Sequence, residues 1–216
     1  MRQGRLAAWL GLVALLILLA YGSRATSGKP PKNALYQYSF AAGGLVEYGL
    51  MLGIVLLIAS GPESRLLLGL RRPRSWPAAL GWAVGLLVGI YVLTGVLTPI
   101  LHPGREQGLT PSGWESSHAG AFAANFIVIA LVAPFVEELT FRGLGFSLLE
   151  PYGRVFAIVA VGLLFGLVHG LVEALPILAA FGAGLAWMRS RTESVYPGML
   201  VHAAFNAIAL TLAVTT

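Results

Sequence analysis

The sequence contains no cysteine, no aspartate and few charged residues of any kind. Without cysteine there can be no disulfide bond, no thiol nucleophile and no thiolate metal site. Charged residues make up only 11% of the 216 residues, whereas 57% are hydrophobic and the mean hydropathy is +0.80. A soluble domain has roughly 25% charged residues, so the composition predicts an integral membrane protein with one polytopic domain.

Hydrophobic runs separated by short segments rich in glycine, proline and arginine predict an all-α fold of about seven transmembrane helices. The first run would also suit a signal peptide, but Tyr21–Arg24 is a poor cleavage site, so we expect this helix to be retained. The fourth run continues to the first strong helix breaker, Glu150–Gly153, which favours one long helix. The expected spans are residues 6–21, 40–60, 76–101, 122–149, 154–171, 175–188 and 197–214.

The basic residues are unevenly divided between the two sides of these spans. Ten of the 14 Lys and Arg lie on the side of the N-terminus and the Pro151 turn, and four lie on the other side. The positive-inside rule then predicts a cytoplasmic N-terminus and, with seven spans, an outer C-terminus. In a bacterium the membrane would be the plasma (inner) membrane. The net charge of +5 therefore indicates orientation in a lipid bilayer rather than binding of nucleic acid.

Two spans carry glycine at every fourth position, a pattern that lets helix backbones approach closely in a membrane. We expect such packing on both spans, and the second glycine series lies beside His169. The two series are Gly81, Gly85 and Gly89 in the third span, and Gly162, Gly166 and Gly170 in the fifth.

Two adjacent glutamates, Glu137 and Glu138, end a strongly apolar stretch of the fourth run. Ionisable groups at bilayer depth are costly, so such a pair is a candidate functional site. Arg142 lies four residues after Glu138, the spacing of a same-face helical pair. Successive helical positions diverge by about 100°, so Glu137 is predicted to face another point and to be free to act as a general base. The alternative is a buried ion-pair cluster that only locks helices together.

Two histidines and an asparagine on later spans extend the candidate site. Glu137 and His169 lie 15 and 17 residues from the turn at residue 152. An antiparallel hairpin would place them at nearly the same depth, roughly 22–25 Å from that turn. His202 and Asn206 are four residues apart, share a helix face and could donate hydrogen bonds to an oxyanion. Hydrogen bonding between helices is the alternative role for these groups.

Together these residues resemble the three signature motifs of the CAAX protease and bacteriocin-processing (CPBP or Abi) family, which includes the type II CAAX prenyl endopeptidases. The motifs lie in order in apolar spans, and the resemblance covers roughly residues 119–216. We expect residues 119–216 to form the catalytic core and residues 1–118 to supply variable spans of the same integrated membrane domain. The motifs are Glu137-Glu138-x-x-x-Arg142, Phe165-x-x-x-His169 and His202-x-x-x-Asn206.

The resemblance implies an all-helical fold with a catalytic cavity between the four C-terminal helices. It also implies intramembrane hydrolysis of a peptide bond in a membrane-associated protein or peptide, either of CAAX type or in bacteriocin and peptide processing. Glu137 and His169 would activate water, and His202 and Asn206 would stabilise the oxyanion. Glu138 belongs to the catalytic set and would hold the site in shape with Arg142, while Phe165 supports it.

The resemblance leaves the part played by metal open, because both metalloprotease and metal-independent glutamate mechanisms are attributed to the family. Glu137, His169 and His202 would suffice to hold a catalytic Zn²⁺ with a water in the fourth position. However, the chain lacks the His-Glu-x-x-His pattern and has no pair of histidines four residues apart.

Two other functions remain as alternatives to a peptidase. A proteolytically silent immunity or scaffold protein of the membrane is the first, although it would have no need of the complete motifs. A proton-coupled transporter would also place Glu and His at depth, but the sequence has no paired halves of the kind expected for inverted repeats. Glu47, in the second span, is expected to have a structural role.

Overall fold

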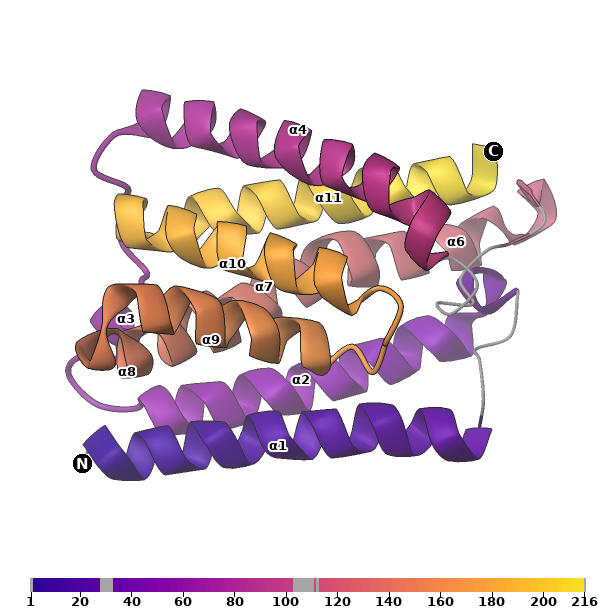
Figure 1. The fold of residues 1–216 in the computed structure, drawn as a ribbon. Helices are drawn as coiled ribbons and strands as arrows, with labels where there is room; N and C mark the ends of the chain where they lie inside the picture. The colour runs from indigo at the N-terminus through magenta and orange to yellow at the C-terminus, as the bar shows by residue number, and fades with distance from the viewer. Residues whose placement is uncertain (1, 28–32, 103–110, 112, 216) are drawn as a thin grey trace.

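The computed structural model describes residues 2–27, 33–102, 111 and 113–215, and within these ranges every regular element is a helix. The predicted all-α fold is confirmed. The longer helices lie side by side and alternate in direction, so α1 begins and α11 ends at opposite ends of the bundle (Figure 1). These helices are α1 Arg2–Ser27, α2 Tyr38–Ala59, α4 Trp76–Leu101, α9 Arg154–Leu167, α10 Leu175–Thr192 and α11 Tyr196–Thr215. Two short elements, η1 Ala34–Tyr36 and α3 Ser64–Leu67, flank α2.

A continuous helix from Ser116 to Tyr152 carries the glutamate pair. The prediction of one long helix through residues 122–149 is confirmed, but the sequence pattern does not predict that two of its segments are π-helical. Its segments are η2 Ser116–His118, α6 Ala119–Ile127, the π-helical η3 Val128–Val132, α7 Ala133–Glu138, the π-helical η4 Leu139–Gly145, α8 Phe146–Leu149 and η5 Glu150–Tyr152.

In the described part of the chain, five helices are long and apolar enough to cross a membrane, and the protein is an integral membrane protein. The number of seven spans is not confirmed. Helix α9 has 14 residues and is roughly 21 Å long, shorter than a hydrocarbon core of about 30 Å. Helix α10 ends with Arg189 and Arg191 in its last turn. The five spans are Arg2–Thr26, Tyr38–Ala59, Trp76–Leu101, Ser116–Tyr152 and Tyr196–Thr215.

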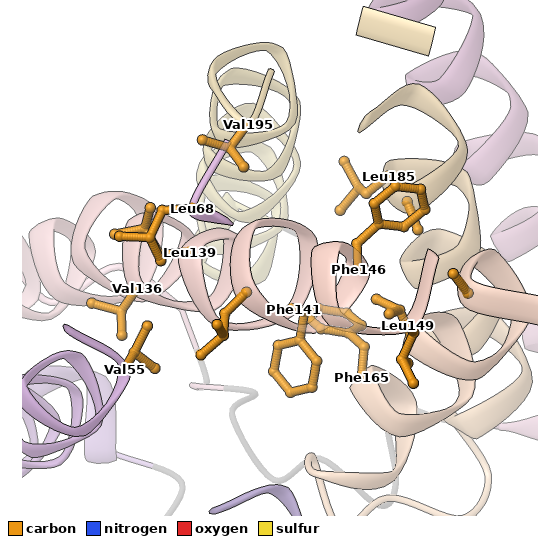
Figure 2. Close-up of a cluster of buried hydrophobic side chains, with 14 of the residues drawn as sticks. Val55, Leu68, Val136, Leu139, Phe141, Phe146, Leu149, Phe165, Leu185 and Val195 are labelled. Carbon is orange, nitrogen blue, oxygen red and sulfur yellow. The ribbon is translucent and has the colours of Figure 1, made fainter. Parts of the chain in front are cut away.

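The main hydrophobic core surrounds the middle of the Ser116–Tyr152 helix (Figure 2). That helix contributes Val136, Leu139, Phe141, Phe146 and Leu149, all of them buried. Buried side chains from the rest of the bundle pack around them, so N-terminal and C-terminal helices share one core. The partners labelled in Figure 2 are Val55 of α2, Leu68, Phe165 of α9, Leu185 of α10 and Val195.

Helix α1 joins this core through Trp9, which is fully buried. The indole Nε1 of Trp9 donates a hydrogen bond to the carbonyl oxygen of Thr140 at 2.9 Å. Its ring lies edge-on to Phe141 with the centroids 6.4 Å apart, and a Cβ at position 145 would collide with it, so Gly145 permits the contact. The first helix is therefore part of the packed bundle, and its retention stays a prediction.

Only one of the two glycine series lies where helices pack closely against each other within the described chain. A Cβ at Gly162 would lie 2.7 Å from the backbone nitrogen of Ala183, and one at Gly166 would lie 2.8 Å from Leu175, so α9 packs closely on α10 there. On α4 no atom lies within 4 Å of a Cβ built at Gly81, Gly85 or Gly89. The expectation for α4 is therefore wrong within the described chain, because these glycines face outward.

We predict that Trp9→Ala destabilises the protein by about 3 kcal/mol, because it removes a buried aromatic ring and leaves the Thr140 carbonyl oxygen without this donor. Thermal unfolding of the purified protein in detergent measures the effect. Trp76→Ala is the matched control, since the Trp76 side chain is exposed at the start of α4. Equal losses from the two substitutions would contradict a structural role of α1 in the core.

Candidate active site

Glu138 and Arg142 form a fully buried ion pair at the predicted spacing of four residues. Nη1 of Arg142 lies 2.9 Å from Oε1 of Glu138, and both side chains are 0% exposed. Nη2 of Arg142 donates to the carbonyl oxygen of Gly182 at 3.1 Å, and its guanidinium lies 4.1 Å from the centre of the Phe165 ring. The pair thus connects the glutamate helix to both α9 and α10, as a supporting role of Arg142 and Phe165 would require.

His202 contacts both glutamates. Its Nδ1 is hydrogen-bonded to Oε1 of Glu138 at 3.2 Å, and its Nε2 lies 3.7 Å from Oε2 of Glu137. The prediction that the two carboxylates face different points is therefore only half right. They diverge around the helix, but His202 is wide enough to meet one carboxylate with each ring nitrogen.

Close packing brings Glu138 against the first turn of α11. A Cβ at Gly198 would lie 2.5 Å from Oε2 of Glu138, so only a glycine leaves room for the carboxylate in its present position. Among the described residues this Oε2 has no hydrogen-bond partner, although it is buried. Gly198 therefore permits the approach of α11 that places His202 beside the pair.

Tyr48 of α2 is a site residue that the sequence did not predict. Its hydroxyl donates a hydrogen bond to Oε1 of Glu137 at 3.0 Å. Glu137 is 9% exposed, so its carboxylate is buried but less completely than that of Glu138. Tyr48 lies 89 positions before Glu137, and no local spacing could have related the two. Its neighbour Glu47 is exposed.

His169 lies in the turn two residues after the end of α9, against Phe165. Its Nδ1 is 2.7 Å from the carbonyl oxygen of Phe165, so Nδ1 must be the donor, and a neutral ring carries its lone pair on Nε2. The Phe165 ring contacts both imidazoles edge-on, with centroid distances of 4.8 Å to His169 and 5.5 Å to His202. Phe165 therefore fixes both histidine rings.

Within the described residues, the predicted pairing of Glu137 with His169 is not seen as a direct contact. Neither a hydrogen bond nor an ion pair joins these two side chains there. The direct contacts of Glu137 are with Tyr48 and His202. The depth of a residue along a helix follows from counting residues. The direction of its side chain also depends on how the helix is rotated about its axis, which packing decides.

Asn206 completes the hydrogen bonding of the first π-helical segment. The Ala133 N–H donates to the carbonyl of Val128, and Pro134 has no N–H, so the Ile129 carbonyl lacks both of its usual helical donors. Nδ2 of Asn206 donates to that carbonyl at 2.9 Å. One Nδ2 hydrogen remains for another acceptor, so the predicted oxyanion role of Asn206 stays a prediction.

The three side chains that would hold a zinc ion, if one binds, are not grouped as a metal site. Across residues 2–27, 33–102, 111 and 113–215, no group of three His, Cys, Asp or Glu side chains is arranged to hold a metal ion. Glu137 and His202 are in contact, but among the described residues His169 is joined to Glu137 by neither a hydrogen bond nor an ion pair. As the described side chains stand, they do not form a zinc site, and zinc binding stays a prediction.

The predicted catalytic cavity between the C-terminal four helices also stays a prediction. Two pockets, of about 510 and 320 Å³, lie at the arginine-rich end of the bundle, where α1 and α9 begin and α10 ends. Their walls contain none of the motif residues.

Residues 119–208, which include all three motifs, match the model of a known protein family. The family is described as type II CAAX prenyl endopeptidase, Rce1-like. The predicted resemblance is confirmed for this part of the chain. The Bacillus subtilis (strain 168) protein YdiL, named as a candidate membrane peptidase, is 31% identical over 81 residues, which are 37% of this chain and 33% of YdiL. The chain thus spans about a third of the length of this curated relative. No solved structure matches it significantly.

We predict that Arg142→Ala destabilises the protein by about 3–5 kcal/mol, because it leaves the carboxylate of Glu138 buried without its cation. Arg154→Ala is the matched control. Arg154 lies 3.9 Å from Glu150 at the same spacing of four residues, but on the surface, and such pairs contribute about 0–1 kcal/mol. Chemical unfolding in detergent compares the two variants. A similar decrease in the free energy of unfolding for both variants would show that the Glu138–Arg142 pair stabilises the protein no more than a surface pair does.

Proposed function

We propose that the protein is an intramembrane endopeptidase that hydrolyses a peptide bond in a membrane-associated protein or peptide. The observation that carries the proposal is the contact of His202 with both Glu137 and Glu138 inside the bundle. Charged side chains are costly at this depth, and these three lie in the part of the chain that matches the Rce1-like family. The substrate would be a CAAX-type protein, or a bacteriocin or other peptide.

Glu137 would be the general base. Its Oε1 accepts the hydrogen bond of Tyr48, which leaves Oε2 to take a proton from water as the water oxygen attacks the carbonyl carbon. Nε2 of His169, which carries the lone pair of the neutral ring, would accept the other hydrogen of that water. After the C–N bond breaks, Glu137 returns its proton to the leaving nitrogen.

His202 and Asn206 would stabilise the tetrahedral oxyanion. Glu138, ionised beside Arg142, accepts the Nδ1–H of His202. Nε2 is 3.7 Å from Glu137, too far for a hydrogen bond, so a protonated Nε2 is free to donate to the oxyanion. This role requires an imidazolium, whose positive charge would balance the negative charge left by two glutamates and one arginine. The second Nδ2 hydrogen of Asn206 would be the other donor.

We further propose that the end of the bundle with the start of α1 and the η5 turn faces the cytoplasm, in the plasma membrane if the source is a bacterium. Its support is the excess of arginine at this end, which agrees with the positive-inside rule. Arg2 and Arg5 begin α1, Arg154 begins α9, and Arg189 and Arg191 end α10.

We predict that Glu137→Gln lowers the cleavage rate by about 10²–10⁴-fold, because the amide cannot accept the proton of water. The full chain in phospholipid vesicles is assayed with quenched fluorescent peptides, with and without a prenylated cysteine in a C-terminal CAAX sequence, and with and without a chelator. Glu115→Gln, outside the site, is the control, and unfolding temperatures show that both variants fold.

Full activity of the Glu137→Gln variant would contradict the assignment of Glu137 as the general base. No cleavage of any peptide by the native chain would favour the silent immunity or scaffold protein. Loss of activity with the chelator, together with stoichiometric zinc, would overturn the metal-free steps.

We predict that Tyr48→Phe lowers kcat about tenfold and leaves KM nearly unchanged, because one hydrogen bond to the base is lost without loss of the ring. Tyr48 would be a positioning residue, so the pH dependence of kcat should shift as well. Tyr91→Phe is the matched control, since among the described residues the Tyr91 hydroxyl makes only a long contact, of 3.4 Å, with the Phe205 carbonyl. Unchanged kcat and pH dependence in Tyr48→Phe would remove Tyr48 from the site.

A further inference from the structure

A pocket of about 510 Å³ lies at the arginine-rich end of the bundle. Its wall combines the start of α1, the α3 region, the segment around α8 and η5, and the end of α10, which meet at the end of the molecule where α1 begins (Figure 1). It is separate from the candidate active site, and five arginines line it: Arg2, Arg5, Arg71, Arg154 and Arg189.

The pocket wall carries more positive than negative charge. The five arginines face only three glutamates, Glu63, Glu150 and Glu193. Arg71 is paired with Glu193, and Arg154 lies 3.9 Å from Glu150. The remaining charges are those of Arg2, Arg5, Arg189 and Glu63, so two positive charges are in excess.

Those three arginines contact backbone carbonyls rather than carboxylates. Arg2 donates to the carbonyl of Ser147 at 3.2 Å, Arg5 to that of Ser60 at 2.6 Å, and Arg189 to that of Arg142 at 3.1 Å. Within the described ranges, none of the three has a carboxylate within 4.0 Å. Carbonyl oxygens satisfy some of the N–H groups but do not neutralise the charge.

The burial of Arg189 is the observation that most favours a bound anion, because this cationic side chain is only 7% exposed. Its guanidinium lies 5.6 Å from the centre of the Phe146 ring, and its Nε would be 2.7 Å from a Cβ at position 69. Gly69 has a φ of +64° and no side chain, so the backbone turns tightly against the guanidinium. A buried cation with no carboxylate in direct contact is costly, and an anion in the pocket would offset that cost.

We propose that this pocket binds the phosphate group of an anionic membrane lipid. The guanidinium fork of arginine matches phosphate oxygens in a bidentate manner. The pocket lies where spanning helices end, the level at which lipid headgroups lie, and basic pockets between helices on the cytoplasmic side suit such headgroups. The proposal does not depend on peptidase activity, because binding can be measured on the Glu137→Gln variant.

Lipid binding to the purified full chain in neutral detergent tests the proposal. The shift of the unfolding temperature is titrated with phosphatidylglycerol, phosphatidylcholine and inorganic phosphate. We expect a saturable shift with phosphatidylglycerol alone. The double variant Arg2→Gln/Arg5→Gln should weaken the apparent affinity about thirtyfold, given the usual contribution of an arginine near an anionic surface. The control, Arg65→Gln/Arg72→Gln, changes the charge equally but lies outside the pocket.

A second variant should strengthen binding, so that a folding defect cannot imitate the result. Glu63→Gln removes a negative charge from the pocket wall and should raise the apparent affinity about fivefold. Glu115→Gln, which is far along the chain and not in the pocket, should leave it unchanged. A saturable shift with inorganic phosphate would assign the site to a soluble phosphate compound instead of a lipid. The proposal is overturned if no anion binds, or if pocket and control variants weaken binding equally.

Discussion

The buried ion pair between Glu138 and Arg142 is the interaction on which the rest of the site depends. Its two charges can remain at this depth only because they neutralise each other and are enclosed on all sides. Arg142 reaches Gly182 of α10 and the ring of Phe165 in α9, while Glu138 reaches His202 of α11. Three helices that follow in the sequence are therefore positioned by contacts with one turn of the glutamate helix.

The π-helical segments explain how this helix serves so many neighbours. Pro134 and the wide turn before it leave the Ile129 carbonyl to Asn206, and the Thr140 carbonyl accepts a hydrogen bond from Trp9. Such segments often occur at functional sites, since they redirect side chains within an otherwise regular helix. Here they connect the glutamate helix to α11 on one side and to α1 on the other.

The same helix also links the candidate active site to the arginine-rich pocket. Arg142 pairs with Glu138 through its side chain, and its backbone carbonyl accepts a hydrogen bond from Arg189 in the pocket wall. Arg142 therefore contacts both the candidate active site, through its side chain, and the pocket wall, through its backbone carbonyl. An anion bound beside Arg189 would stabilise the end of the bundle that supports the carboxylates, which gives the lipid environment a direct physical route to the site.

The sequence by itself determined membrane residence, the all-α fold, the long fourth helix and the Glu138–Arg142 pair. Each of these depends on composition or on spacing within one helix. Because a helix has 3.6 residues per turn, such spacing shows which residues share a face. Only the tertiary structure showed Tyr48 beside Glu137, His202 between the two glutamates, His169 turned to the Phe165 carbonyl and the outward-facing glycines of α4. These depend on the rotation and packing of helices that are distant in sequence, and hydrophobic spans look alike on faces that meet lipid and on faces that meet protein.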